Sequence, residues 1–66
     1  MIGTYIYTND LKIQKQLQVV EKKENEYSII IWNTNAGFPS EIAGTGFISE
    51  EKLKNFLNHY NAIKMI

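Results

Sequence analysis

Residues 27–33 (YSIIIWN) form a segment that is apolar on both sides, and this constrains the fold more than any other feature of the chain. Its β-branched and aromatic residues favour a strand, in which successive side chains point to opposite faces. Tyr27, Ile29 and Ile31 would face one way, and Ile30 and Trp32 the other. A strand of this kind needs cover on both faces, which a half-exposed antiparallel strand does not have.

One amphipathic helix is predicted near the C-terminus, where apolar residues recur with the spacing i, i+3, i+4, i+7. The residues of this apolar stripe are Leu53, Phe56, Leu57 and Tyr60. Ser49 stands where a helix N-cap belongs. Glu50 and Glu51 follow in the first turn, where carboxylates interact favourably with the helix dipole. Such a helix can cover only one face of a sheet.

The remaining segments are predicted to be mostly strands. Residues 1–8 are rich in β-branched and aromatic residues, and residues 41–48 could form a last short strand. Residues 34–40 are predicted to be a loop. Residues 21–26 are predicted to form a polar hairpin turn, in which Asn25 is able to take a positive φ. Gly44-Thr45-Gly46 is predicted to be a flexible corner that bends the last strand into the helix.

Two segments leave alternatives open. In residues 11–23, Leu11, Ile13, Leu17 and Val19 follow the period of a half-buried strand, which we favour. The same segment also contains good helix formers and would form a helical stripe with Asp10 as its cap. The apolar tail, residues 61–66, either extends the helix, or adds a strand to this sheet or to the sheet of a second copy.

The sequence therefore predicts one α+β domain over residues 1–66, a four-stranded antiparallel sheet followed by one C-terminal helix (ββββα). We expect a homodimer, because the second apolar face of the central strand has no cover within the chain. The residues expected at the dimer interface are Ile30, Trp32, Ile63 and Met65.

Composition limits the chemistry. The chain has no Cys, one His and no net charge, so disulfides and the usual zinc sites are not expected, nor is any cofactor. All seven basic residues are Lys, and the absence of Arg argues against a protein that reads DNA sequence. No stretch has the length of a membrane span, and no signal peptide is evident, so the expected location is the cytoplasm.

No group of residues forms a catalytic signature, and we expect that the protein is not an enzyme. Gly44-Thr45-Gly46 lacks the spacing of a dinucleotide or phosphate-binding loop, so these glycines are expected to serve the backbone. His59 is expected in the last helical turn, where a cation interacts favourably with the free C-terminal carbonyl groups. The sequence identifies no nucleophile or carboxylate that could act with His59 as a general base.

The run Gly46-Phe47-Ile48-Ser49-Glu50-Glu51-Lys52-Leu53, a helix start after a predicted sheet, resembles the end of single-stranded DNA-binding domains of the positive-coactivator type. That resemblance implies a curved sheet that grips single strands and a helix that dimerises. The chain departs from the family because it lacks basic strand loops and an Arg- and Lys-rich N-terminal half.

The function expected from the sequence is a small non-catalytic protein-binding module. Its size and its Lys-, Ile- and Asn-rich composition are typical of a bacteriophage or mobile-element accessory protein that inhibits or modulates a host protein. The alternative is a single-stranded nucleic-acid-binding sheet, since aromatic rings stack on bases and Lys tracks phosphates. Candidate contacts to a partner or nucleic acid are Tyr5, Tyr7, Lys12, Lys15 and Phe38. A third hypothesis is sequestration of a small ligand at a dimer cleft.

Overall fold

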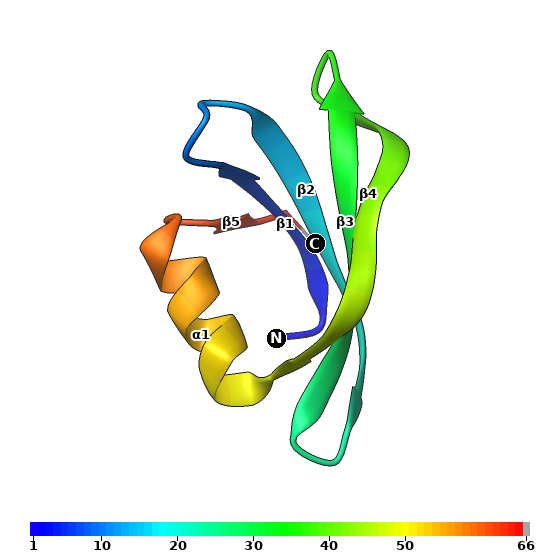
Figure 1. The fold of residues 1–66 in the computed structure, drawn as a ribbon, viewed down its shortest axis with the longest axis vertical. Helices are drawn as coiled ribbons and strands as arrows, with labels where there is room; N and C mark the ends of the chain where they lie inside the picture. The colour runs from blue at the N-terminus through cyan, green and yellow to red at the C-terminus, as the bar shows by residue number, and fades with distance from the viewer. Residues whose placement is uncertain (66) are drawn as a thin grey trace.

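The computed structural model describes residues 1–65 as a curved antiparallel sheet with one helix against it. The elements in chain order are β1 (Gly3–Thr8), β2 (Gln14–Lys23), β3 (Glu26–Asn35), β4 (Phe38–Ser49), α1 (Glu50–His59) and β5 (Ile63–Lys64). The five strands lie in the order β4-β3-β2-β1-β5, and every neighbouring pair is antiparallel. Figure 1 shows α1 on the concave side of the sheet. We call this side the inner face and the opposite side the outer face.

The α+β class and the antiparallel sheet are confirmed, but the expected four-stranded sheet is wrong. The tail adds a fifth strand to this sheet, which is one of the alternatives stated for residues 61–66. The chain leaves α1 through Asn61, whose φ is +51°. The Asn61 N–H donates to the Asn58 carbonyl (3.2 Å) and the Ala62 N–H to the Leu57 carbonyl (2.9 Å), the pair of bonds that defines a Schellman motif. This turn directs the chain back to β1, where Ile63 pairs with Ile6.

Residues 11–23 are mostly strand, as favoured above, but β2 begins only at Gln14. The residues before it form a tight turn, in which the Asn9 side-chain oxygen accepts the Leu11 and Ile13 N–H groups, each at 3.0 Å. Lys12 has a φ of +64° there. Leu11 and Ile13 are exposed as a result, and only Leu17 and Val19 of the alternating set enter the core.

The core lies between the inner face and α1. Its buried members are Tyr5, Tyr7, Leu17, Val19, Tyr27 and Leu53. Leu53, from the predicted stripe of the helix, is completely enclosed. The ring of Tyr7 meets those of Phe56 and Tyr60 at centroid distances of 5.1 and 5.3 Å, within the range of favourable aromatic pairs. The stripe therefore packs on the inner face as the sequence predicted.

The start of the helix is fixed to the β2–β3 hairpin. The predicted N-cap is confirmed, since the Ser49 hydroxyl accepts the Lys52 N–H at 3.2 Å. The Glu50 N–H donates to the Asn25 carbonyl at 3.0 Å, and the Glu50 carboxylate lies 3.7 Å from the Lys22 ammonium. The backbone bond and the cap hold the helix start in place, while the exposed ion pair adds little.

The β2–β3 and β3–β4 turns differ from the sequence-based expectation. In the β2–β3 turn the positive φ (+59°) belongs to Glu24 and not to Asn25. The loop expected over residues 34–40 is only a two-residue turn, because β3 continues to Asn35 and β4 begins at Phe38. Ala36 and Gly37 both have positive φ, +54° and +84°, as a type I′ hairpin turn requires.

We expect Ala36→Asn to stabilise the protein, because Ala36 holds a left-handed conformation that costs an L-residue about 1–2 kcal/mol and that Asn adopts more easily. A gain of about 1 kcal/mol would raise the Tm of a domain of this size by roughly 4–8 °C, measurable by circular dichroism. Ala43→Asn is the matched control, since Ala43 lies in β4 without a positive φ and should give no gain. A Tm for Ala36→Asn at or below that of the unmodified protein would contradict the strain assigned to this turn.

Candidate functional site

The outer face carries two cross-strand rows of side chains that contain no charged residue. The first row runs over all five strands as Ile63, Ile6, Gln16, Trp32 and Ile42. The second runs over four strands as Thr4, Gln18, Ile30 and Thr45. Within these two rows the β1 and β2 half is mainly polar and uncharged, whereas the β3 and β4 half is largely apolar. The next row toward the β2–β3 turn brings Glu21 of β2 beside Ser28 and Phe47.

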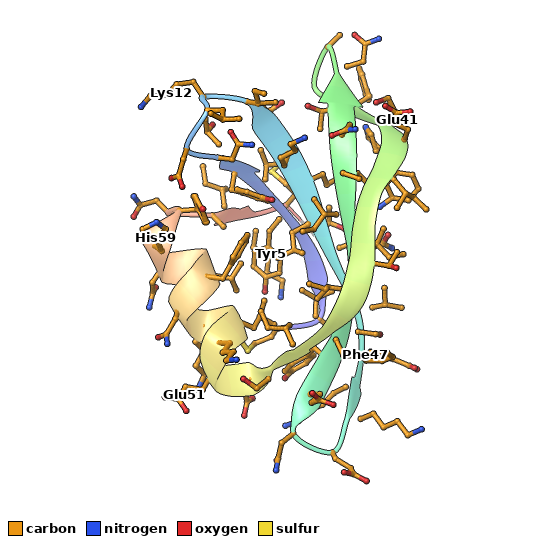
Figure 2. All side chains as sticks on the ribbon, in the orientation of Figure 1. Tyr5, Lys12, Glu41, Phe47, Glu51 and His59 are labelled. Carbon is orange, nitrogen blue, oxygen red and sulfur yellow. The ribbon has the colours of Figure 1, made fainter. Side chains whose placement is uncertain are left out.

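Five large apolar side chains gather over β3, β4 and the adjoining part of β2, and we call them the outer patch. They are Val20, Ile30, Trp32, Ile42 and Phe47. Phe47 is 70% exposed and points away from the sheet on the side opposite α1, whereas Tyr5 lies between α1 and the sheet (Figure 2). Ile42 and Val20 are also exposed, at 53% and 44%. α1 covers only the inner face, so it gives the outer patch no cover.

Two local features shape the outer patch. A register shift between Val19 and Glu21 marks a bulge in β2, which brings Val20 beside the side chains of β3 and β4. A shallow hollow of about 310 Å³ opens there, with Val20, Ile30 and Phe47 among its lining residues. The floor of the patch is thus concave, a shape that can receive a protruding side chain.

Trp32 is the aromatic residue of the outer patch on β3. Its ring is half-buried among its strand neighbours, and its indole N–H donates to the Gln18 side-chain oxygen at 3.2 Å. The polar group of Trp32 is satisfied within the chain, which leaves its apolar surface for contact. Trp is among the residues enriched at the centres of protein interfaces, where polar residues form the surrounding rim.

The five contacts predicted for a partner or a nucleic acid are not brought together, and two of them are buried. Tyr5 and Tyr7 are each only 7% exposed, because β1 turns them toward α1, so their rings are not available to stack on bases. Lys15 lies on the inner face and its ammonium donates to the Asn33 side-chain oxygen. Lys12 lies in the β1–β2 turn and Phe38, 73% exposed, at the β3–β4 turn.

The four residues predicted for a dimer interface do not form one cluster. Ile30 and Trp32 belong to the outer patch. Ile63 lies in the same row as Trp32, but three strands away, which is about 14 Å at the usual strand spacing. Met65 follows β5, and its N–H donates to the Thr4 carbonyl at 2.7 Å. The short β5 therefore adds exposed apolar residues at the far edge of the sheet.

The sequence reasoning missed three members of the outer patch. Val20, Ile42 and Phe47 were not singled out as contacts. For Phe47 the signal was present, since Phe47 and Ile48 are successive strand residues and Ile48 pairs with Tyr27 of the inner face. Alternation then turns Phe47 outward. Alternation likewise turns Val20 outward after the buried Val19. The outward position of Ile42 depends instead on the register shift between Ile31 and Trp32, which no simple period predicts.

The features considered for chemistry lie in β4 and at the end of α1. Gly44 and Gly46 lie within β4, paired with Ile31 and Ile29, so the expected corner is wrong and the glycines are separated from the helix start. His59 stacks edge-on against Tyr60 at 4.6 Å. Among residues 1–65, no three His, Asp or Glu side chains form a group that could hold a metal ion.

Comparisons with protein-family models, with curated proteins and with solved structures gave no match for this chain. Within the described residues, no helix has both the length and the apolar character needed to cross a membrane.

Two tyrosines near the end of α1 have shifted acidities. Burial raises the pKa of Tyr7 above its usual 10.0, and the neighbouring Tyr60 raises it further. Loss of hydration raises the pKa of Tyr60, as does Asp10, whose carboxylate accepts the Tyr60 hydroxyl at 3.4 Å. Both phenols therefore hold their protons more tightly in the folded chain than in the unfolded one.

We expect the free energy of unfolding to fall as the pH rises past about 10, because unfolded tyrosines ionise there while Tyr7 stays protonated in the fold. The stability that this difference in pKa provides is fully present below pH 10, and it is lost as the pH rises through the raised pKa of folded Tyr7. Tyr7→Phe should reduce the loss, as measured by urea unfolding at several pH values. Val19→Ala removes core packing away from this cluster, since Val19 is buried opposite Gly3, so it should lower stability by a similar amount at every pH. An unchanged alkaline loss in Tyr7→Phe would refute the assignment.

Proposed function

We propose that this chain is a non-catalytic protein-binding module that contacts its partner through the outer patch. The observation that supports this most strongly is the gathering of Val20, Ile30, Trp32, Ile42 and Phe47 on a sheet face that the chain's own helix does not cover. Apolar surface of this kind, bordered by polar residues, marks interaction sites on small proteins.

The chemistry of the patch defines the complementary surface. The partner offers a neutral, apolar surface with one protruding side chain for the hollow beside Phe47. Gln16 and Gln18 border the patch on β2 and supply donors and acceptors for polar groups at the rim. A nucleic acid would meet little attraction here, because neither uncharged row contains a Lys.

A second copy of the chain can use the same surface, and we propose a homodimer centred on Ile30 and Trp32. Ile63 and Met65 lie toward the opposite edge of the sheet and take no part in that centre. Burial of one large apolar side chain is worth about 1.5–3 kcal/mol, and each copy contributes such residues. Self-association and binding of another protein then compete for one patch.

The proposed biological setting is an accessory protein of a bacteriophage or mobile element that inhibits or modulates a host protein in the cytoplasm. Its support is the composition, with Lys as the only strongly basic residue and many Ile and Asn, as AT-rich genomes encode. A protein that acts by occupying a partner's surface needs no catalytic group, and the chain offers no catalytic signature in its sequence.

Trp32→Lys should weaken self-association at least tenfold, since the loss of about 1.4 kcal/mol of burial per site already changes Kd by that factor. Sedimentation equilibrium at micromolar to millimolar concentration measures the effect. Leu11→Lys is the matched control, because Leu11 is 77% exposed in the β1–β2 turn, away from the patch, and carries the same change of charge.

The same pair of variants tests binding of another protein. In a pull-down from a low-GC bacterial lysate, a stoichiometric partner should be retained by Leu11→Lys and lost by Trp32→Lys, with both variants folded by circular dichroism. If the unmodified protein stays monomeric at millimolar concentration and recovers no partner, the proposal is wrong. Salt-sensitive binding of an oligonucleotide would favour the nucleic-acid alternative instead.

A further inference from the structure

A second apolar feature lies on the opposite side of the sheet, where α1 does not close against β3 and β4. It is a cleft of about 240 Å³, which we call the inner cleft. Its lining residues are Leu17, Ile29, Ile31, Ile48, Leu53 and Phe56. All six are aliphatic or aromatic, so no lining side chain offers a hydrogen bond or a charge to a ligand.

The cleft exists because β4 carries no side chain at two successive inner-face positions. Gly44 and Gly46 pair with Ile31 and Ile29, two residues that line the cleft. A methyl group built on either glycine would meet no atom within 4 Å. Ile29, Ile31 and Phe56 are consequently only half-buried, although they face the core. The cleft is thus open on its β4 side.

The size and lining of the cleft select the ligand class. An apolar cavity of about 150 Å³ stays dry and takes benzene, so 240 Å³ corresponds to a ligand of roughly ten carbons. Polar and charged molecules would lose their hydration in such a site without compensation. A narrow space between a helix and a sheet suits an unbranched chain.

The cross-strand row of inner-face residues next to the cleft suits the uncharged head group of such a ligand. Lys15, Asn33 and Glu41 lie side by side one row beyond Ile31 and Gly44, about 7 Å along the strands. Lys15 donates to the Asn33 side-chain oxygen, and the Asn33 amide donates to a Glu41 carboxylate oxygen at 3.3 Å. The two charges balance, so the row attracts neither a cation nor an anion strongly, while a hydroxyl group can join its hydrogen bonds.

We propose that the inner cleft binds the hydrocarbon chain of an unbranched aliphatic molecule with an uncharged polar head. The proposal is independent of the protein-binding function, which uses the other face of the sheet. The ligand lies between α1 and the inner face, with its head toward Lys15, Asn33 and Glu41. It fills space that the chain's own side chains leave open.

A titration with 1-alkanols, from 1-butanol to 1-dodecanol, tests the proposal by methyl NMR. Shifts are expected at the methyl groups of Ile29, Ile31 and Ile48, and not at Ile30 and Ile42 of the outer patch. Affinity should rise about fourfold for each added CH₂ and level off near ten carbons, when the cleft is full. Equal shifts at the outer isoleucines, an affinity that never levels off, or no shift up to the solubility limit would each overturn the proposal.

Variants of β4 provide the matched comparison. Gly46→Val places a side chain on the open side of the cleft at a position without a positive φ, and should lower 1-octanol affinity at least tenfold. Thr45→Val adds the same side chain one residue away on the outer face and should leave the affinity unchanged. Gly44→Val is a second test of the same kind should Gly46→Val fold poorly. Unchanged affinity in a folded glycine variant would refute the site.

Trp32→Lys should bind 1-octanol with unchanged affinity, because Trp32 lies on the outer face. The test of the inner cleft is therefore separate from the test of protein binding.

Discussion

The packing of α1 against the inner face is the contact on which the rest of the structure depends. Leu53 is completely enclosed there, and Phe56 and Tyr60 extend the contact to Tyr7. A helix of ten residues is only about 15 Å long, however, while the molecule extends over 35 Å. The helix therefore covers part of one face, and the uncovered outer patch and the open inner cleft both follow from this limit.

Periodicity in the sequence was sufficient for the parts of the fold that depend on local alternation. The alternation in residues 27–33 and in the second half of residues 11–23 placed β3 and β2, and the spacing of Leu53, Phe56 and Tyr60 placed α1. The sequence also identified Ile30 and Trp32 as residues of a face that the helix leaves uncovered. These features need no knowledge of distant contacts, because each depends on neighbours within one or two turns or on successive strand residues.

The errors come from features that depend on tertiary contacts or on single backbone angles. β5 depends on the turn at Asn61 and on its pairing with β1, which no period in residues 61–66 predicts. The burial of Tyr5 and Tyr7 follows from which side of β1 meets α1, and the sequence identified their shared face but not its cover. The positive φ values at Glu24 and Ala36 contradict the usual residue preferences. Composition therefore located the β2–β3 turn but favoured Asn25 for its positive φ, and it made the β3–β4 turn too long.

The free edge of β4 adjoins the outer patch, and its construction bears on how a partner would approach. Pro39 and Glu41, together with register shifts opposite residues 31–34 of β3, interrupt the first half of this edge. Proline, charge and bulges are the devices by which natural sheets prevent pairing with a further strand. The opposite edge is the two-residue β5, which is too short to act as a template and which ends in Lys64. Pairing with a further strand is thus impeded at β5 and along the first half of the β4 edge, whereas no charged residue stands in the rows through Trp32 and Ile30. The apolar, neutral partner surface that we propose would therefore bury most area by packing across the outer face, and not by pairing with an edge strand.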